Sequence, residues 1–331
     1  MRFLSNPNFN FLKWRWHAIA LSAIVILAGI LTIVARGGLP LGVDFSGGTV
    51  IVVQFTQPTG EDRVRQALGT MSSEASVQRF GPATNNAILI RLPLEPGADQ
   101  ANSLSAVSER VEQALRAANV GPFSVINREL VGATIGRDLQ QKGIWATLTA
   151  IGGILVYIAV RFRFGFAVGA VVATFHDILV TLAFLTWFGY DLTLNVVAAI
   201  LTIAGYSVND TIVVFDRVRE NQRILRRESL DTIVNQAVNQ TLSRTVITSG
   251  TALLTALALF FFGGEVLHGF AFTMVVGIIT GTYSSVFIAA AIVSFWRGAG
   301  PTRAAAHATA PAIAPQQPAR RSKPQRKARA S

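Results

Sequence analysis

Cysteine is absent from this 331-residue chain, and only 14% of the residues are charged. Without cysteine there is no disulfide framework, zinc finger or thiol nucleophile, so a domain outside a membrane must fold on its hydrophobic core alone. The chain also lacks the glycine-rich Gly-Lys-Ser/Thr loop of P-loop proteins, which excludes ATP hydrolysis by that route. With 51% hydrophobic residues and a mean hydropathy of +0.44, the composition indicates a polytopic membrane protein.

Six apolar runs predict six transmembrane helices, because each is long enough to cross a bilayer. The first run leads into Arg36 and two glycines without a small-residue cleavage site, so we expect an uncleaved helix and not a signal peptide. The runs cover residues 17–35, 144–160, 166–188, 194–215, 246–262 and 270–296.

Basic residues lie on one side of the predicted bundle. Arginines follow the second, fourth and sixth runs, whereas the short links after the third and fifth runs contain no Lys or Arg. The positive-inside rule then places both termini in the cytoplasm and the domain 36–141 outside, in the periplasm if the cell is Gram-negative. The net charge of +11 is accordingly assigned to topology and contact with anionic lipid, and not to nucleic acid. The predicted division is 1–16 cytoplasmic N-terminus, 17–35 first helix, 36–141 periplasmic domain, 142–298 helices two to six, and 299–331 disordered basic cytoplasmic tail.

The segment 36–141 has the pattern of a water-soluble α+β domain. Strand-forming stretches and helical spacings alternate in the order β-α-β-β-α-β, which is the ferredoxin-like arrangement. That fold hosts many functions, so it does not indicate an activity. The predicted strands are 50–57, 76–80, 87–92 and 123–131, and the predicted helices are 61–71 and 99–119.

The predicted cytoplasmic link 217–243 has an apolar residue every three or four positions from Leu230 to Leu242. Ser229 is a candidate N-cap, so we expect a short amphipathic helix on the inner membrane surface. The C-terminal tail 299–331 is rich in Ala, Pro and basic residues, which is typical of disorder. Cytoplasmic retention and contact with acidic lipid are its expected roles, with ribosome or nucleic-acid binding as a weaker option.

The fourth apolar run contains an acidic residue, Asp210. An ionised carboxylate in hydrocarbon costs about 2.5–3.5 kcal/mol even on an insertion scale, so such a residue normally faces a bundle interior and is a candidate functional site. The alternative is a structural polar contact between two helices. Function is favoured because polar residues accompany Asp210 in the sequence: Tyr206, Ser207, Asn209 and Thr211.

Three further polar residues lie in or near the predicted membrane region. Arg244 falls at a depth similar to that of Asp210 and could pair with it, or its side chain could extend to the interface. Asp177 is a second acid within a predicted span. Its neighbour His176 could relay protons, since imidazole titrates near neutral pH, or it could be a hydrogen-bonded packing residue.

Several stretches resemble the SecF proteins of the SecD/SecF family, in the RND superfamily. The resemblance covers about residues 10–298, including six spans with one outside domain after the first helix. The stretches that carry it are GVDFSGGT at 42–49, AGYSVNDTIVVFDRVREN at 204–221, NQTLSRTVITS at 239–249 and GTYSSVFIA at 281–289.

The resemblance implies a non-enzymatic subunit that uses the proton motive force to assist protein translocation and release. It implies pairing with SecD in a twelve-helix bundle at the SecY-SecE-SecG translocon, with YajC and YidC as further candidate partners, preproteins as substrates, and no cofactor besides the coupling ion, H⁺. Asp210 matches the proton-carrying acid of the family and Arg244 its basic partner. His176 and Asp177 also match the family pattern, with a less certain role.

Three other functions stay open at this stage. A proton-driven RND exporter of lipids or small molecules would be expected to have a second large outside loop, and the link 263–269 is too short for one. A passive scaffold would tolerate Asp210→Asn. An intramembrane protease would need Asp177 and Asp210 close enough to share a proton.

Overall fold

The computed structural model describes residues 7–69, 71, 75–81, 83–93, 101–162 and 164–296. The predicted basic tail 299–331 lies outside the described residues. Within them, six helices are long and apolar enough to cross a membrane, which confirms the predicted number of spans and a multi-pass membrane protein. They are α1 (Arg15–Ala35), α5 (Ala133–Arg161), α6 (Phe164–Phe188), α7 (Leu194–Ile224), α8 (Leu230–Phe262), and α9 (Glu265–Ser284), which continues through η4 (Ser285–Ala289) into α10 (Ala290–Trp296).

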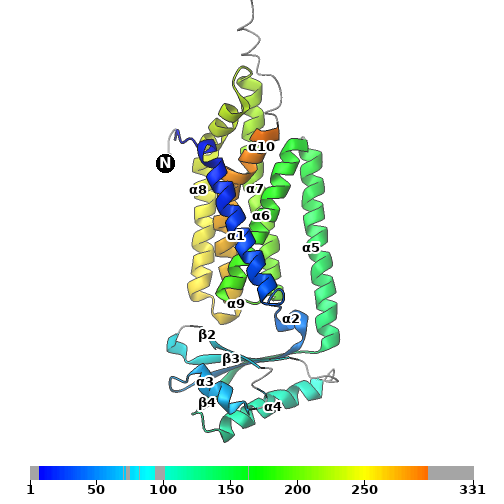
Figure 1. Ribbon diagram of the computed structural model, residues 1–331, viewed down its shortest axis with the longest axis vertical. Coiled ribbons are helices and arrows are strands. Elements are labelled where there is room, and N and C mark those ends of the chain that lie inside the picture. The colour runs from blue at the N-terminus through cyan, green and yellow to red at the C-terminus, as the bar shows by residue number, and fades with distance from the viewer. Residues whose placement is uncertain are drawn as a thin grey trace, which may run out of the picture. The chain divides into compact units, whose positions relative to one another are not determined.

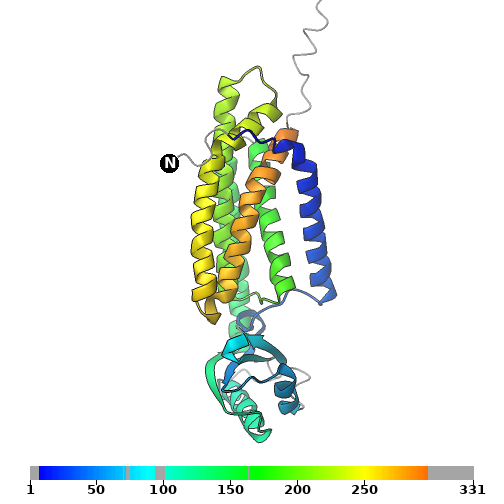
Figure 2. The same ribbon diagram turned by 90° about the vertical axis from the view of Figure 1, so that its left-hand side faces the viewer.

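Helices α6, α7 and α9 form the centre of the bundle, and α1, α5 and α8 lie around it (Figures 1 and 2). Half or more of the residues are buried in the most apolar part of each central helix, whereas only 6% are buried in the most apolar part of α5. Small residues allow close approach at two crossings. A Cβ added to Gly29 would lie 2.3 Å from Ala183 Cβ, and one added to Gly277 would lie 2.1 Å from Ile203 Cδ1.

Helix α8 corrects the prediction for the link 217–243. The sequence predicted a separate amphipathic helix on the membrane surface, but residues 230–262 form one continuous helix. Ser229 does cap it, since its hydroxyl accepts from the Thr232 N–H at 3.1 Å. The apolar stripe is buried inside the protein, where Val234 and Ala237 are fully covered by the same core as Phe215 of α7. The apolar stripe therefore packs within this chain and does not lie on the membrane surface as a separate helix.

The segment between α1 and α5 folds around a four-stranded antiparallel sheet with the strand order β2-β3-β1-β4. Its elements follow the predicted order β-α-β-β-α-β. They are β1 (Gly48–Phe55), α3 (Glu61–Ala67), β2 (Ser76–Phe80), β3 (Ala87–Leu92), α4 (Ala101–Ala117) and β4 (Phe123–Val131). Alternate residues of β1, among them Ile51 and Val53, form its core with Val64 of α3 and Leu115 of α4. We call this segment the sheet domain.

The GVDFSGGT stretch forms a sharp junction before the sheet. Val43–Ser46 make a short helix, α2, and Gly47 and Gly48 then take φ values of 71° and 123° that favour glycine. A Cβ on Gly48 would lie 2.4 Å from the Leu92 carbonyl oxygen. Both glycines are therefore required by the backbone path.

Helix α5 begins at Ala133, inside the predicted domain 36–141 and well before the apolar run that starts at 144. Its first turns pack on α2. A Cβ added to Gly136 would lie 3.1 Å from the Gly47 nitrogen, and one added to Gly143 would lie 3.3 Å from the Phe45 ring. The polar start of this helix is thus stabilised by contact with α2, which hydropathy alone does not show.

Candidate functional site

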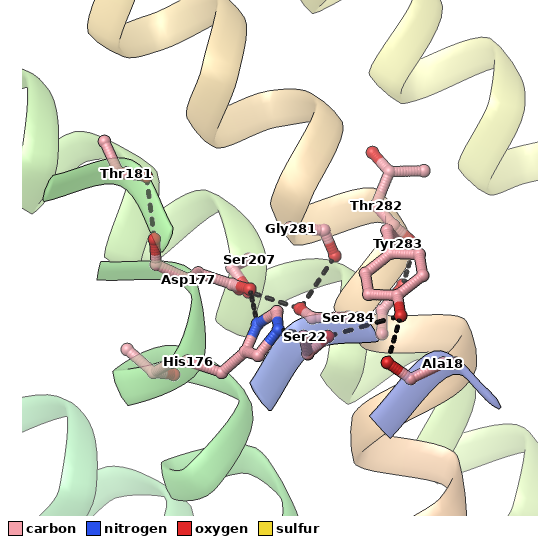
Figure 3. Close-up of polar contacts among 12 residues, drawn as sticks. Ala18, Ser22, His176, Asp177, Thr181, Ser207, Gly281, Thr282, Tyr283 and Ser284 are labelled. Carbon is pink, nitrogen blue, oxygen red and sulfur yellow. Dashed lines mark hydrogen bonds and ion pairs between the residues drawn. The ribbon is translucent and has the colours of Figure 1, made fainter. Parts of the chain in front are cut away.

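Asp177 lies at the centre of the bundle and is fully buried. One carboxylate oxygen, Oδ2, accepts hydrogen bonds from Ser207 of α7 and from Ser284 of α9, the latter at 2.8 Å (Figure 3). A carboxyl oxygen has two lone pairs and can accept both hydroxyl donors. Three helices therefore supply the groups that hold this acid.

The other oxygen, Oδ1, contacts the ring of His176, 2.9 Å from Nδ1. The second ring nitrogen, Nε2, lies 2.9 Å from the Ser22 hydroxyl of α1. Ser22 donates to the Tyr283 hydroxyl at 3.2 Å, and Tyr283 donates to the Ala18 carbonyl at 2.8 Å (Figure 3). A polar chain thus runs from Asp177 through His176 to the first helix.

The proton count along this chain is constrained. Because Ser22 donates its only proton to Tyr283, the Nε2 atom of His176 must be the donor toward Ser22. The contact between Nδ1 and Asp177 then needs one more proton, carried either by the ring or by the carboxyl group. His176 and Asp177 therefore share one hydrogen in this contact.

Asp210 is half-buried and lies one turn of α7 after Ser207. Thr245 of α8 donates to its Oδ1 atom at 2.7 Å, and Ser285 donates to its Oδ2 atom at 2.6 Å. Helix α8 thus reaches Asp210 at the depth that the sequence predicted for Arg244.

Neighbouring residues connect the two acids. Ser207 and Asp210 lie one turn apart on α7, while Ser284 and Ser285 are consecutive at the point where α9 passes into the π-helix η4. A π-helical turn inside an α-helix often marks a functional site, because the extra residue redirects side chains. Here it lets two consecutive serines bind two different carboxylates.

The expected partners of Asp210 are only partly in place. Arg244 is exposed, and the ion pairs of the described residues do not join it to Asp210. Asn209 is exposed, and Thr211 is buried with its hydroxyl unpaired. Tyr206 is half-buried and its phenol contacts the side chains of Thr282 and Ser249. Ser207 binds Asp177 and not Asp210.

The sequence prediction missed several partners of the two acids. Thr245 follows Arg244 directly, and Ser284 and Ser285 lie in the stretch 281–289, which carries the family resemblance but no charged residue. A hydroxyl group in an apolar run gives little signal by itself, because it can also bond to its own helix, as Thr174 does with the Ala170 carbonyl at 2.9 Å. The missed residues that contact the acids or His176 are Ser22, Thr245, Ser284 and Ser285.

The arrangement is suited to holding and passing protons within the bundle. It has two carboxyl groups, one imidazole and several hydroxyl groups, each of which can accept or donate a proton. Among the described contacts, Asp177 and Asp210 each bind their own hydroxyl donors and not each other. This does not support the shared-proton dyad of an intramembrane protease.

Two protein families match segments of this chain. Residues 110–299 match the family described as "Protein export membrane protein SecD/SecF, C-terminal", which covers more than half of the chain. This chain belongs to the SecD/SecF family. Residues 33–59 match the "SecD/SecF GG Motif", and this segment includes the junction at Gly47 and Gly48.

Related SecD/SecF proteins match most of the chain. The protein translocase subunit SecF of Desulfurispirillum indicum is 40% identical over 87% of this chain and 91% of the relative. The protein translocase subunit SecF of Escherichia coli O157:H7 is 38% identical over 86% of each. The function of this SecD/SecF chain is therefore in protein translocation.

Solved structures of SecDF show the same fold. A crystal structure of SecDF, a translocon-associated membrane protein from Thermus thermophilus, matches 89% of this chain with a TM-score of 0.78 and 34% identity. SecDF in a super-membrane-facing form matches 92% of the chain with a TM-score of 0.63 and 35% identity. The chain spans 39% of the first SecDF chain and 40% of the second.

Proposed function

We propose that this chain couples the movement of protons across the bacterial inner membrane to protein translocation. The single observation that carries the proposal is the pair of acids at the centre of the bundle, Asp177 and Asp210, joined through consecutive serines. Acidic residues at this depth are rare outside ion pathways. The proposed ion is H⁺, which the carboxyl, imidazole and hydroxyl groups can all carry.

Protonation of Asp210 changes what the bundle can hold together. Ionised Asp210 accepts from Thr245 of α8 and from Ser285 after α9, and so ties three helices. Protonation removes its charge and adds a donor, which weakens both contacts. One charge crossing 100 mV is worth about 2.3 kcal/mol, so one proton per cycle can bias a two-state equilibrium if the two forms of Asp210 favour different arrangements.

The proposed partner is SecD, as in the SecDF structures. Two exposed polar side chains on membrane-spanning helices support this, Asn209 of α7 and Arg244 of α8, because such polar groups in hydrocarbon normally face protein. In the assembly Arg244 would lie at the interface with SecD, near the acid that it was expected to pair with.

In the proposed topology, the sheet domain is a ferredoxin-like domain outside the cytoplasm and both termini lie inside. Preproteins would reach the sheet domain from SecY-SecE-SecG, with YajC and YidC nearby. The chain itself would catalyse no reaction and need no cofactor. Its contribution would be mechanical, namely proton-driven movement that helps a preprotein leave the channel.

The test uses inverted membrane vesicles that contain SecD and this chain, with a reporter preprotein. Release is compared with and without a proton gradient for wild type, Asp210→Asn and the control Asp216→Asn. Asp216 lies on α7 like Asp210, but its exposed carboxylate pairs with Arg161 of α5. We expect the gradient to accelerate release in wild type and in the control only. An equal response of Asp210→Asn would refute proton coupling and favour a passive scaffold.

A further inference from the structure

The link between α6 and α7 is held by the sheet domain through backbone contacts. The Gly42 N–H donates to the Leu192 carbonyl at 2.8 Å, and the Leu192 N–H donates to the Pro40 carbonyl at 2.7 Å. These bonds make a short parallel bridge between Leu41 and Leu192. The segment before the GG motif is therefore paired with the segment that leads into α7.

The side chain of Asp44 adds a contact to the helix itself. Its Oδ2 atom accepts from the Leu194 N–H, the first residue of α7, at 2.8 Å. The first N–H groups of a helix have no partner within it and carry the positive end of the helix dipole, so a carboxylate there is favourable. An acid of the GG motif thus caps the helix that carries Asp210.

An ion pair between Arg91 of β3 and Asp191 of the link completes the attachment. Both side chains are about four-fifths buried, at 20% and 19% exposure, so solvent screens the pair only weakly. Arg91 belongs to a strand with neighbours on both sides, Val50 of β1 and Ser76 of β2, and so cannot shift without the sheet.

The link is also fixed from the side of the bundle. The Tyr190 ring stacks on Phe272 of α9 with centroids 4.4 Å apart, and its hydroxyl lies 2.9 Å from His268 Nδ1. The described residues 189–193 are therefore held by neighbours on both sides, unlike a free surface loop. Helix α7 continues from them without a break for 31 residues, past Ser207 and Asp210.

We propose that Arg91 and Asp44 are positioning residues that fasten the sheet domain to the link before α7 and to the first turn of that helix. A displacement of α7 set by the protonation of Asp210 then reaches the sheet domain as a rigid-body movement. The inference rests on the proposed proton coupling and adds the route by which it leaves the membrane. It requires that the attachment stay closed throughout the cycle.

The first test removes the ion pair. In the vesicles described above, Arg91→Ala should lose the gradient-dependent part of preprotein release while release without a gradient is unchanged. The matched control is Arg79→Ala, which removes an arginine that pairs with Glu61 within the sheet domain at 3.9 Å. The exchanged pair Arg91→Asp with Asp191→Arg should restore the response, since it restores opposite charges at the same place.

The second test replaces the attachment by a covalent bond, which the absence of native cysteine makes unambiguous. The pair Leu41→Cys and Leu192→Cys lies at the backbone bridge, where a disulfide can form. Oxidation should leave the gradient response of the otherwise native chain intact and should restore it in Arg91→Ala. If oxidation blocks the native response, the attachment must open during the cycle and the inference is wrong.

The outcomes separate the two proposals. If Asp210→Asn loses the gradient response and Arg91→Ala keeps it, proton coupling stands and the route through Arg91 is refuted. If Asp210→Asn keeps the response, proton coupling fails, and this inference fails with it. Membrane levels and protease resistance of the sheet domain, measured for every variant, identify any loss that is due to misfolding. A folding failure of Arg91→Ala leaves the disulfide in the native background as the deciding test.

Discussion

Ser284 and Ser285 are consecutive in the chain, yet they donate to carboxylates on two different helices, Asp177 of α6 and Asp210 of α7. Their hydroxyl oxygens lie 2.8 and 2.6 Å from the respective acceptors. A change of helical register at this point would alter both contacts at once. The two acids are therefore coupled through one turn of backbone, without direct contact between their side chains.

Double-mutant cycles with Ser285 should show that it interacts with Asp210 and not with Asp177. Ser285→Ala combined with Asp210→Asn should be non-additive, with a coupling free energy of about 0.6–1.7 kcal/mol, because the two residues share a hydrogen bond. Ser285→Ala with Asp177→Asn should be closer to additive. Thermal unfolding of the four members of each cycle in detergent would measure this. Equal coupling in both cycles would contradict the assignment.

Asp177→Asn should destabilise the protein more than Asp210→Asn. Asp177 is fully buried and its carboxylate contacts three side chains, so Asp177→Asn replaces charge-assisted hydrogen bonds by neutral ones at a buried site. Hydrogen bonds to charged groups contribute about 1.5–3 kcal/mol each, against about 0.5–1.5 kcal/mol for neutral ones. Asp210 is half-buried and can turn toward water or a partner. Apparent melting temperatures in detergent check the order, with the exposed Asp216→Asn expected to stay close to wild type.

The crossing of α1 and α6 depends on the absence of a side chain at Gly29. Gly29→Ala should destabilise the bundle by about 1–3 kcal/mol, because its Cβ would lie 2.3 Å from Ala183 Cβ. Adding Ala183→Gly should recover most of the loss. Gly152→Ala is the control, since a Cβ there meets no atom within 4 Å. Failure of the second substitution to rescue the first would place the strain elsewhere.

Arg244→Ala should affect assembly and not the isolated chain. The Arg244 side chain is exposed, so we expect the free energy of unfolding to change by no more than about 0.5 kcal/mol. Recovery of the complex with SecD should fall about tenfold, which corresponds to about 1.4 kcal/mol of binding. Co-purification of tagged SecD measures this, with the exposed Arg226→Ala as control. A strongly destabilised isolated chain would show an intramolecular role instead.

Much of the architecture follows from the sequence because long apolar runs and alternating strand patterns are strong signals. The six spans and the order of the sheet domain are confirmed for this reason. Helix ends were less predictable. The sequence gives no stop signal between Leu230 and Phe262, and the start of α5 at Ala133 depends on its contact with α2, which no local pattern reveals.

The site was predictable where charge marked it and not where hydroxyl groups completed it. Asp177, His176 and Asp210 stand out because charged and titratable groups are rare in apolar runs. Their partners, such as Ser285 and Thr245, resemble ordinary packing residues until the helices are placed side by side. The role of Asp44 was hidden for a similar reason, since its target is a backbone N–H far away in the sequence.

The hairpin of α7 and α8 is longer than a bilayer requires. Its helices contain 31 and 33 residues, or about 46 and 50 Å at 1.5 Å per residue, against a hydrocarbon thickness of about 30 Å. Part of this excess forms a paired arm that ends at the turn 225–229 (Figure 1). Because α7 and α8 continue without a break from this arm into the membrane-spanning part, a displacement at the turn 225–229 would be transmitted along both helices to Asp210 and Thr245.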